Sequence, residues 1–256
     1  MNIAIDIGNS NIVTGIFSKG IWQHIWRIQT HSSGEALPFY ESRFNDLFLE
    51  NDIELGEIKN VIISSVVPDK NQVIDQLFRL IYGLKVHWIN SQIYPKLPIG
   101  IHNPLEIGTD LVSNALAAHL GYQKNCIIVD FGTALTFTTL TETGNIIGVS
   151  IVPGLITAIK TLSSKTAQLP EVIFSPPASA LGHNTTTAIQ SGIYHGYTGL
   201  VTHIVKTLKE ELKAPYMVIA TGGLANQIHS LDALFDEKNP HLTLDGIMAM
   251  LTYIES

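Results

Sequence analysis

The chain has 256 residues, of which 45% are hydrophobic and 14% are charged, and its formal net charge is −7. This length allows one large or two modest domains, and the composition is typical of a compact α/β protein. An acidic balance without a lysine or arginine cluster argues against a nucleic-acid partner. The single cysteine, Cys126, excludes an intrachain disulfide and favours a reducing compartment. With no basic leader and no apolar run of about 20 residues, we expect a cytoplasmic protein with no membrane partner.

In the first half, apolar runs predict strands at 3–7, 12–17, 20–30, 61–67 and 85–89. Apolar residues at helical spacing predict helices over 39–51, 71–82 and 110–122. Residues 90–107, rich in proline, are expected to form a loop. Ser64 and Ser65, inside the run at 61–67, either pack as small residues or face a ligand cleft.

The second half repeats this alternation of strands and helices. We expect a three-stranded meander followed by a helix after Pro153 and Gly154. A long periodic stretch then predicts one helix or a helix pair. A strand, a glycine turn opening a helix and a final helix complete the chain. The predicted ranges are strands at 127–131, 134–140, 145–152 and 216–220, and helices at 155–165, 186–212, 224–229 and 244–254.

Two turns of the same layout carry the chemistry that we expect. In the first, an apolar strand ends at Asp6 and continues into Gly8, Asn9 and Ser10. Glycine allows close backbone approach, the short polar side chains can bind phosphate, and the carboxylate can hold Mg²⁺. A single turn of this kind could equally be an ordinary hairpin with local side-chain hydrogen bonds.

A second copy of the turn makes the functional interpretation stronger. Asp130, Gly132 and Thr133 follow another apolar strand in the same spacing. A third turn, Gly222-Gly223, follows a further strand, a layout suited to phosphate or adenosine contact. Repetition on this scale indicates two related halves.

Two Asp-x-Gly turns and a glycine pair in this arrangement resemble the nucleotide site of the superfamily that contains actin, hexokinase and heat-shock ATPases. The chain is similar over nearly its whole length to the type III pantothenate kinases, whose motifs it carries in order. The resemblance implies two ribonuclease-H-like α/β domains, 1–115 and 116–256, with an interdomain nucleotide cleft. The matching motifs begin at Gly108, Asp130, Val152, Leu169, Gly182, Thr221 and Leu242.

The resemblance also implies an activity, the ATP-dependent phosphorylation of pantothenate to 4′-phosphopantothenate in coenzyme A biosynthesis. It places Mg²⁺ at Asp6, a monovalent cation (K⁺ or NH₄⁺) at Asp130 and ATP at Thr133. It further implies a homodimer, for which the helix at 186–212 could supply an interface. The positions expected to bind ATP or its phosphates are Asp6, Ile7, Gly8, Asn9, Ser10, Asn11, Ile12, Val13, Thr133, Gly222 and Gly223.

Asp110 is the candidate base that removes the proton of the acceptor hydroxyl. Taken alone, an Asp at a helix start is more often a cap, and both roles are compatible. Thr185 matches a position that contacts the acceptor, although it could also cap a helix. The substrate positions implied by the resemblance are Ile101, Gly108, Thr109, Asp110, Leu111 and Thr185.

The acceptor side departs from the family pattern at two positions. Leu111 stands where the family has arginine, and Ile101 where it commonly has tyrosine. Both changes remove polar groups that suit a small carboxylate-bearing substrate. One alternative is therefore a sister kinase for another small hydroxyl compound. The other is a non-catalytic nucleotide-binding homologue, against which the retention of Asp6, Asp110 and Asp130 argues.

Overall fold

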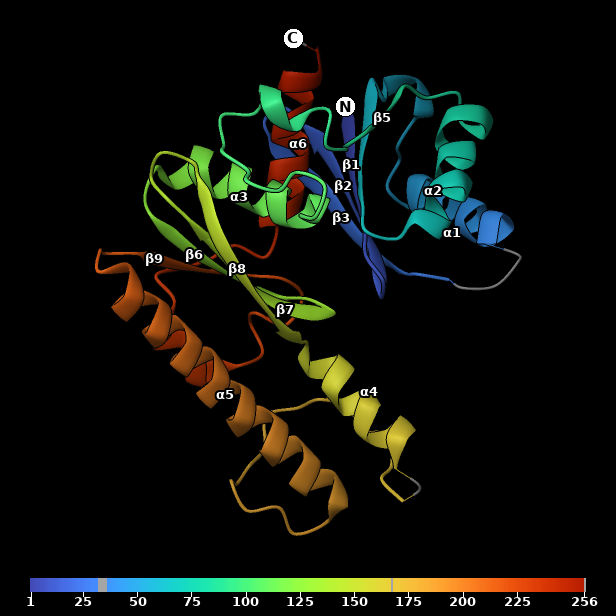
Figure 1. Ribbon diagram of the computed structural model, residues 1–256. Coiled ribbons are helices and arrows are strands. Elements are labelled where there is room, and N and C mark those ends of the chain that lie inside the picture. Colours follow the sequence, from blue (N-terminus) through green and yellow to red (C-terminus); the bar gives the residue numbers. More distant parts are fainter. Residues whose placement is uncertain (32–35, 167, 256) are drawn as a thin grey trace. The chain divides into compact units, whose positions relative to one another are not determined.

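The computed structural model describes residues 1–31, 36–166 and 168–255, and the chain divides into two compact units (Figure 1). Unit 1 comprises Met1–Ala117 together with the segment from Thr243 to the C-terminus, and unit 2 comprises Ala118–Leu242. The predicted boundary at 115–116 lies close to the observed division. The prediction that the second domain continues to residue 256 is wrong, because the last helix belongs to unit 1.

Unit 1 is built on a five-stranded sheet in the order β3-β2-β1-β4-β5. β1, β2 and β3 form an antiparallel meander, and β4 and β5 run parallel to β1. The helix predicted at 71–82 is two segments, α2 and a π-helical stretch at Gln76–Ile81. The bounds are β1 Asn2–Ile7, β2 Asn11–Ser18, β3 Ile21–Gln29, β4 Asn60–Ser65, β5 Val86–Trp88, α1 Ala36–Glu50, α2 Pro68–Asp75, α3 Thr109–Tyr122 and α6 Leu242–Glu255, with 3-10 helices at Leu55–Glu57 and Tyr94–Lys96.

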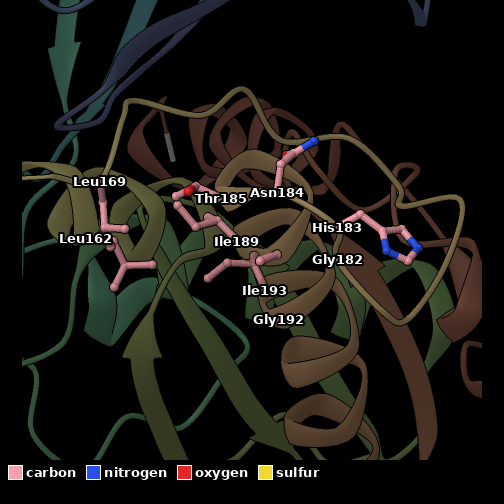
Figure 2. Close-up of a pocket in the computed structure, with 10 residues that line it drawn as sticks. Leu162, Leu169, Gly182, His183, Asn184, Thr185, Ile189, Gly192 and Ile193 are labelled. Atoms are coloured by element: carbon pink, nitrogen blue, oxygen red, sulfur yellow. The ribbon is translucent and has the colours of Figure 1, made fainter.

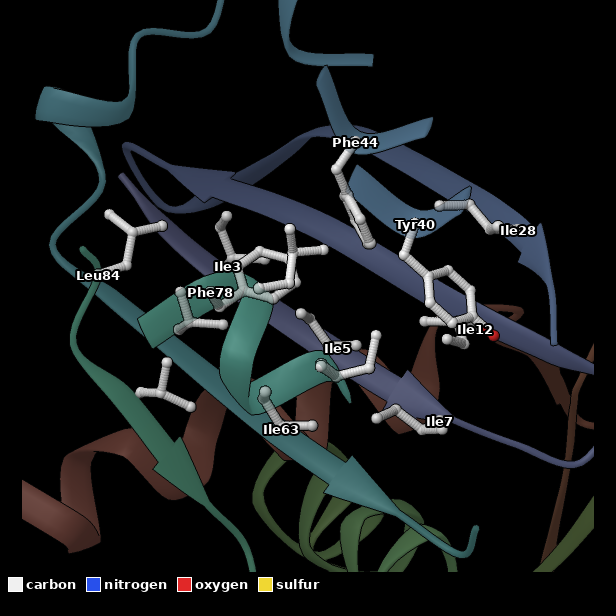
Figure 3. Close-up of a cluster of buried hydrophobic side chains, with 14 of the residues drawn as sticks. Ile3, Ile5, Ile7, Ile12, Ile28, Tyr40, Phe44, Ile63, Phe78 and Leu84 are labelled. Atoms are coloured by element: carbon white, nitrogen blue, oxygen red, sulfur yellow. The ribbon is translucent and has the colours of Figure 1, made fainter. Parts of the chain in front are cut away.

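The two faces of this sheet are covered by different helices. Alternate residues of β1, among them Ile3 and Ile5, point into a core shared with Tyr40 and Phe44 of α1 and Phe78 of the π-helical stretch (Figure 3). Burial of this apolar surface is the main force that holds the layers together.

α6 packs against the other face of the same sheet. Trp22 of β3 donates a hydrogen bond from Nε1 to Asp245 Oδ1 at 2.7 Å. A Cβ atom on Gly15 of β2 would lie 2.5 Å from the Trp22 ring and 3.1 Å from Leu244 Cδ1, so the absence of a side chain there makes room for Trp22 and for the helix. These contacts explain why the end of the chain belongs to unit 1.

Unit 2 repeats the topology of unit 1. Its five strands follow the order β10-β9-β6-β7-β8, which from the opposite edge matches the order in unit 1. The residues at 185–212 form one continuous helix rather than a pair. The prediction of two ribonuclease-H-like α/β units is therefore confirmed. The bounds are β6 Cys126–Phe131, β7 Ala134–Leu140, β8 Ile146–Pro153, β9 Met217–Thr221, β10 Glu237–Lys238, α4 Leu155–Lys165 and α5 Thr185–Leu212.

The helix predicted directly after the Gly222-Gly223 turn does not form. Ala225 N–H donates to Gly222 O at 3.3 Å, and Gln227 N–H donates to Leu224 O at 2.9 Å. Each bond joins a residue to the third residue before it, whereas an α-helical bond reaches the fourth. A 3-10 helix follows at His229–Leu234.

α5 covers one face of the unit 2 sheet. Tyr197, Val201 and Val205 of α5 belong to a core cluster with Ile127 and Val129 of β6. The periodic apolar residues of this helix are therefore used in the core of its own unit. Among the described residues, no helix is long and apolar enough to cross a bilayer.

Candidate active site

The first acid turn connects β1 and β2 in unit 1. Gly8 N–H donates to Asn11 O at 2.9 Å, which closes the turn, and a Cβ on Gly8 would lie only 3.2 Å from that oxygen. Thr30 holds the turn from the end of β3: its hydroxyl donates to Gly8 O at 2.7 Å and its N–H donates to Ser10 O at 3.0 Å. Three hydrogen bonds thus hold the turn, and Ser10 is exposed at its tip, where a phosphate could contact it.

Not all predicted residues of this turn can contribute side chains. Ile7 and Ile12 are fully buried in the core, so only their backbone could meet a nucleotide. Asn11 and Val13 are half-buried in β2, and Asn9 is exposed beside Ser10.

Asp110 lies in the first turn of α3. Its Oδ1 accepts a hydrogen bond from Leu111 N–H at 2.8 Å, a local contact that differs from the usual helix cap. Burial raises the pKa of the Asp110 carboxyl, and the N–H groups of Leu111 and of Asp110 itself oppose this shift. Burial and, secondly, the charge of Asp110 raise the pKa of the Tyr94 phenol to about 12, so Tyr94 is close enough to Asp110 for their charges to interact.

The residues before Asp110 connect α3 to the sheet. Ser64 lies near the end of β4, and its hydroxyl donates a hydrogen bond to Thr109 Oγ1 at 2.8 Å. Ser64 is the β4 partner of Asp6 in the parallel β1–β4 pair. The structure thus brings two predicted acids, Asp6 and Asp110, to the same end of one sheet.

The two positions that depart from the family pattern carry apolar side chains at this site. Leu111 is 8% exposed, and Ile101 is half-buried in the loop before α3. Neither offers the polar contact that arginine or tyrosine would.

The second acid turn connects β6 and β7 in unit 2. A Cβ on Gly132 would lie 3.1 Å from Ala134 O, so this turn is as tight as the first. The carbonyl oxygen of Thr133 accepts hydrogen bonds from Gly154 N–H at 3.0 Å and from the Thr157 hydroxyl at 2.7 Å. The start of α4 therefore holds the turn in place.

Asp130 is surrounded by two threonines and a glycine. Its strand partners are Thr136 on β7 and Thr221 on β9. The hydroxyls of both threonines are buried and have no hydrogen-bond partner among the described residues. Gly222 has a φ of +89°, and a Cβ there would meet Asp130 Oδ1 and lie 2.7 Å from Phe131 N. Only glycine fits against Asp130 at this turn.

Thr185 lies in a different part of unit 2, at the start of α5 (Figure 2). Asn184 is the cap of this helix, because its side chain accepts from Thr187 N–H at 2.9 Å. Thr185 is the first helical residue and is exposed at an open pocket of about 610 Å³, so it is not the cap. Ile189 and Ile193 of α5 line the pocket together with Leu162 of α4.

In the described part of the chain, neither acid turn carries a cluster of metal-ligating side chains. The described residues contain no group of three or more His, Cys, Asp or Glu side chains that could hold a metal ion. A metal at either acid turn would therefore need ligands from hydroxyls, backbone carbonyls, water or a phosphate in addition to one carboxylate.

The sequence assigned no role to the side chains of four threonines that shape the site. Thr30 and Thr157 hold the two acid turns, and Thr136 and Thr221 flank Asp130. Their common signal is position beside an acid turn: Thr30 and Thr221 lie at strand ends, Thr157 lies in the first turn of α4, and Thr136 is the β7 partner of Asp130.

Two α/β units of this topology, each with an acid turn at the end of its first strand, form a two-unit ribonuclease-H-like fold. The fold is similar to that of the activator of the 2-hydroxyisocaproyl-CoA dehydratase from Clostridium difficile (TM-score 0.53, 13% identity, 99% of this chain and 94% of that one covered). It is also similar to that of the (R)-2-hydroxyglutaryl-CoA dehydratase component A from Acidaminococcus fermentans (TM-score 0.55, 13% identity, 99% and 98% covered).

Sequence comparison is more specific. The family model described as type III pantothenate kinase matches residues 2–207. The type III pantothenate kinase of Citrifermentans bemidjiense is 39% identical, with 96% of this chain and 97% of that protein covered. That of Dehalococcoides mccartyi is 38% identical, with 96% and 93% covered. The chain belongs to the type III pantothenate kinase family.

Proposed function

We propose that this protein transfers the γ-phosphoryl group of ATP to the hydroxyl group of pantothenate, giving 4′-phosphopantothenate in the cytoplasmic synthesis of coenzyme A. The family match carries this proposal, because relatives 39% identical to the chain cover 96% of it. Membership of the family makes the protein a kinase with an alcohol acceptor. Asp6 and Asp130 lie near the ends of β1 and β6, and Asp110 lies in the first turn of α3, which supports the proposal.

Unit 1 would supply the metal contact and the base. Magnesium-bound ATP provides the phosphoryl group and neutralises charge as that group leaves. Asp6 would hold Mg²⁺, and the turn from Gly8 to Ser10 would hold phosphate oxygens. Asp110 would take the proton of the acceptor hydroxyl. Its raised pKa supports this role, because a carboxylate with a higher pKa is a stronger base.

Unit 2 would supply a monovalent cation site and part of the ATP site. The buried hydroxyls of Thr136 and Thr221, without partners among the described residues, fit an oxygen-ligated ion beside Asp130. One carboxylate with neutral oxygens suits a singly charged ion, K⁺ or NH₄⁺, better than a divalent ion, which prefers more negative charge. Thr133, Gly222 and Gly223 would contact ATP. The assay is turnover at equal ionic strength in K⁺, NH₄⁺ and Na⁺, and equal rates in all three would contradict this role.

In unit 1 the acceptor would lie against Ile101, Gly108, Thr109 and Leu111. Thr185, in unit 2, is the further substrate position that the family resemblance implies. A second candidate function is the phosphorylation of a less polar hydroxyl compound, which the buried Leu111 favours. A coupled assay of ADP release with a panel of small alcohols, pantothenate included, separates the two. Turnover of another alcohol but not of pantothenate would support the second candidate.

A double substitution tests the acceptor from the side of the protein. If pantothenate is the substrate, Leu111→Arg with Ile101→Tyr should raise kcat/KM for pantothenate or leave it unchanged, because it restores polar groups suited to a carboxylate. Loss of a native activity on another alcohol in this variant would instead support the second candidate.

The protein would act as a homodimer. β8 is an edge strand of the unit 2 sheet, and its residues Ile147, Val149 and Ile151 are 43%, 38% and 65% exposed. Such an apolar row on a strand edge favours association with a second copy. It is a better candidate interface than α5, whose apolar residues pack in the core.

Sedimentation at micromolar concentration tests the dimer. A species of 28.0 kDa would contradict it. Ile151→Glu should shift a dimer towards monomer, whereas Leu105→Glu, at a position 87% exposed in unit 1, should not. Dissociation by both variants would mean that charge alone, and not the β8 row, accounts for the effect.

A further inference from the structure

Ser64 connects the strand beside Asp6 to the helix that carries Asp110. Its side chain is fully buried, and its Cα is paired with that of Asp6, so the two side chains lie on one face of the sheet. The Ser64 hydroxyl donates to Thr109 Oγ1 at 2.8 Å, and Thr109 Oγ1 donates to Ser65 O at 3.3 Å. A chain of hydrogen bonds therefore runs from the level of Asp6 to the residue that precedes Asp110.

Other contacts fix the same turn of the chain. The Ser113 hydroxyl donates to Thr109 O at 2.7 Å, which holds the first turn of α3 from within the helix. A Cβ on Gly108 would meet Asp110 Oδ1, so a side chain at this position would displace the Asp110 carboxylate. The turn has little freedom to adjust, so a shift of Thr109 would move the Asp110 carboxylate.

We propose that Ser64 is a positioning residue for the kinase reaction, which acts through Thr109 to set the Asp110 carboxylate relative to Asp6. The proposal rests on the proposed role of Asp110 as the base. A buried hydroxyl that lacks a partner destabilises a protein, and the bond to Thr109 satisfies the hydroxyl of Ser64. The bond also fixes a distance on which catalysis depends, since a misplacement of about 1 Å can reduce a rate by about 10²-fold.

The test begins with Ser64→Ala. We expect kcat to fall by about tenfold, part of the range that misplacement produces, while KM for ATP changes by less than about twofold because the Asp6 turn is untouched. Ser64→Thr keeps the hydroxyl and should restore most of kcat. The matched control is Thr14→Val, which removes another fully buried hydroxyl from the same sheet, one that has no partner among the described residues. This control should keep wild-type kcat.

A double-mutant cycle separates positioning from a general structural effect. In an Asp110→Asn background, Ser64→Ala should cause no further loss of kcat, because the group that it positions is gone. Loss by the same factor in both backgrounds would overturn the proposal. So would wild-type kcat in a folded Ser64→Ala protein when Asp110→Asn alone is severely impaired. If Asp110→Asn alone keeps near-normal turnover, the base assignment itself fails, which is a distinct result.

Thr109→Val keeps the experiment decisive if Ser64→Ala does not fold. It breaks the same hydrogen bond from the helix side with nearly unchanged side-chain shape. We expect the same selective loss of kcat and the same absence of further loss with Asp110→Asn. Normal kcat in folded Thr109→Val protein would overturn the proposal.

Discussion

The two sheets share one topology, yet the residues beside their acids differ. In unit 1 the strand partners of Asp6 are Val13 and Ser64, and in unit 2 those of Asp130 are Thr136 and Thr221. Val13 and Thr136 occupy equivalent positions, as do Ser64 and Thr221.

The equivalent hydroxyls are used in different ways. That of Ser64 is bonded to Thr109 and so helps to hold α3 and Asp110. That of Thr221 is buried and has no partner among the described residues, which leaves it available to a ligand. The comparison shows that the fold places an acid at the end of the first strand in both units, and that the hydroxyl on the neighbouring parallel strand is bonded to α3 in unit 1 but has no partner among the described residues in unit 2.

The largest effect that we expect comes from Asp110→Asn. It removes the basic oxygen and the charge while keeping the shape of the side chain. A base of this kind contributes about 10²- to 10⁴-fold, or roughly 3 to 5 kcal/mol, so kcat should fall by about that factor with near-normal ATP affinity. Steady-state kinetics and ATP titration measure both. Near-normal turnover of the folded variant would mean that Asp110 is not the base.

The raised pKa of Asp110 gives this variant a signature in stability and in pH dependence. Because its folded pKa lies above its unfolded one, the folded state binds more protons between the two values, and stability falls as pH rises through that window. Asp110→Asn should therefore be as stable as wild type or more stable at neutral pH. The wild-type kcat/KM should fall on the acid side through a pKa above the ordinary aspartate range. Thermal unfolding and a pH–rate profile measure these, and a destabilised variant would assign Asp110 a structural role.

A smaller effect is expected at Gly222, which shapes the unit 2 site. Gly222 and Gly20 both have positive φ, +89° and +82°, but an added Cβ at Gly20 meets nothing within 4 Å. Gly20→Ala should therefore show only the conformational cost, about 1 kcal/mol of unfolding free energy. Gly222→Ala should cost more, up to about 3 kcal/mol, and weaken ATP binding, because its Cβ meets Asp130. Equal losses in denaturant unfolding would mean that contact with Asp130 is unimportant.

The two threonines beside Asp130 are expected to affect the ion rather than the fold. Thr221→Val should reduce the activation of turnover by K⁺ over Na⁺. The substitution replaces the hydroxyl, a proposed ligand of the ion, by a methyl group of similar size. Its unfolding free energy should stay the same or rise, since a buried hydroxyl without a protein partner is removed. Thr14→Val should show the same stability change without any change in K⁺ activation. If both variants respond alike to K⁺, the ion does not bind beside Thr221.

The sequence predicts the strand, acid and glycine of each unit, because these depend on local spacing. It also places Asp110 at the start of a helix. It could not assign α6 to unit 1, since that depends on the contact of Trp22 with Asp245, far away in the chain. Nor could it pair Ser64 with Thr109, because strand register and the position of α3 together decide which hydroxyls meet.

The smallest effect is expected at the threonines that hold the two acid turns. The Thr30 hydroxyl donates to Gly8 O at 2.7 Å, and the Thr157 hydroxyl donates to Thr133 O at 2.7 Å. Each valine variant keeps the side-chain shape and removes one hydrogen bond, which contributes about 0.5 to 1.5 kcal/mol, or roughly 2- to 10-fold in affinity. When the threonine hydroxyl is removed, the Thr133 carbonyl still accepts a hydrogen bond from Gly154 N–H at 3.0 Å. Among the described residues, the Gly8 carbonyl has no such second bond from the start of a helix. Thr30→Val should therefore weaken ATP binding more than Thr157→Val, as measured by calorimetric titration. The reverse order would show that the unit 2 turn, rather than the turn at Asp6, contributes more to holding the nucleotide.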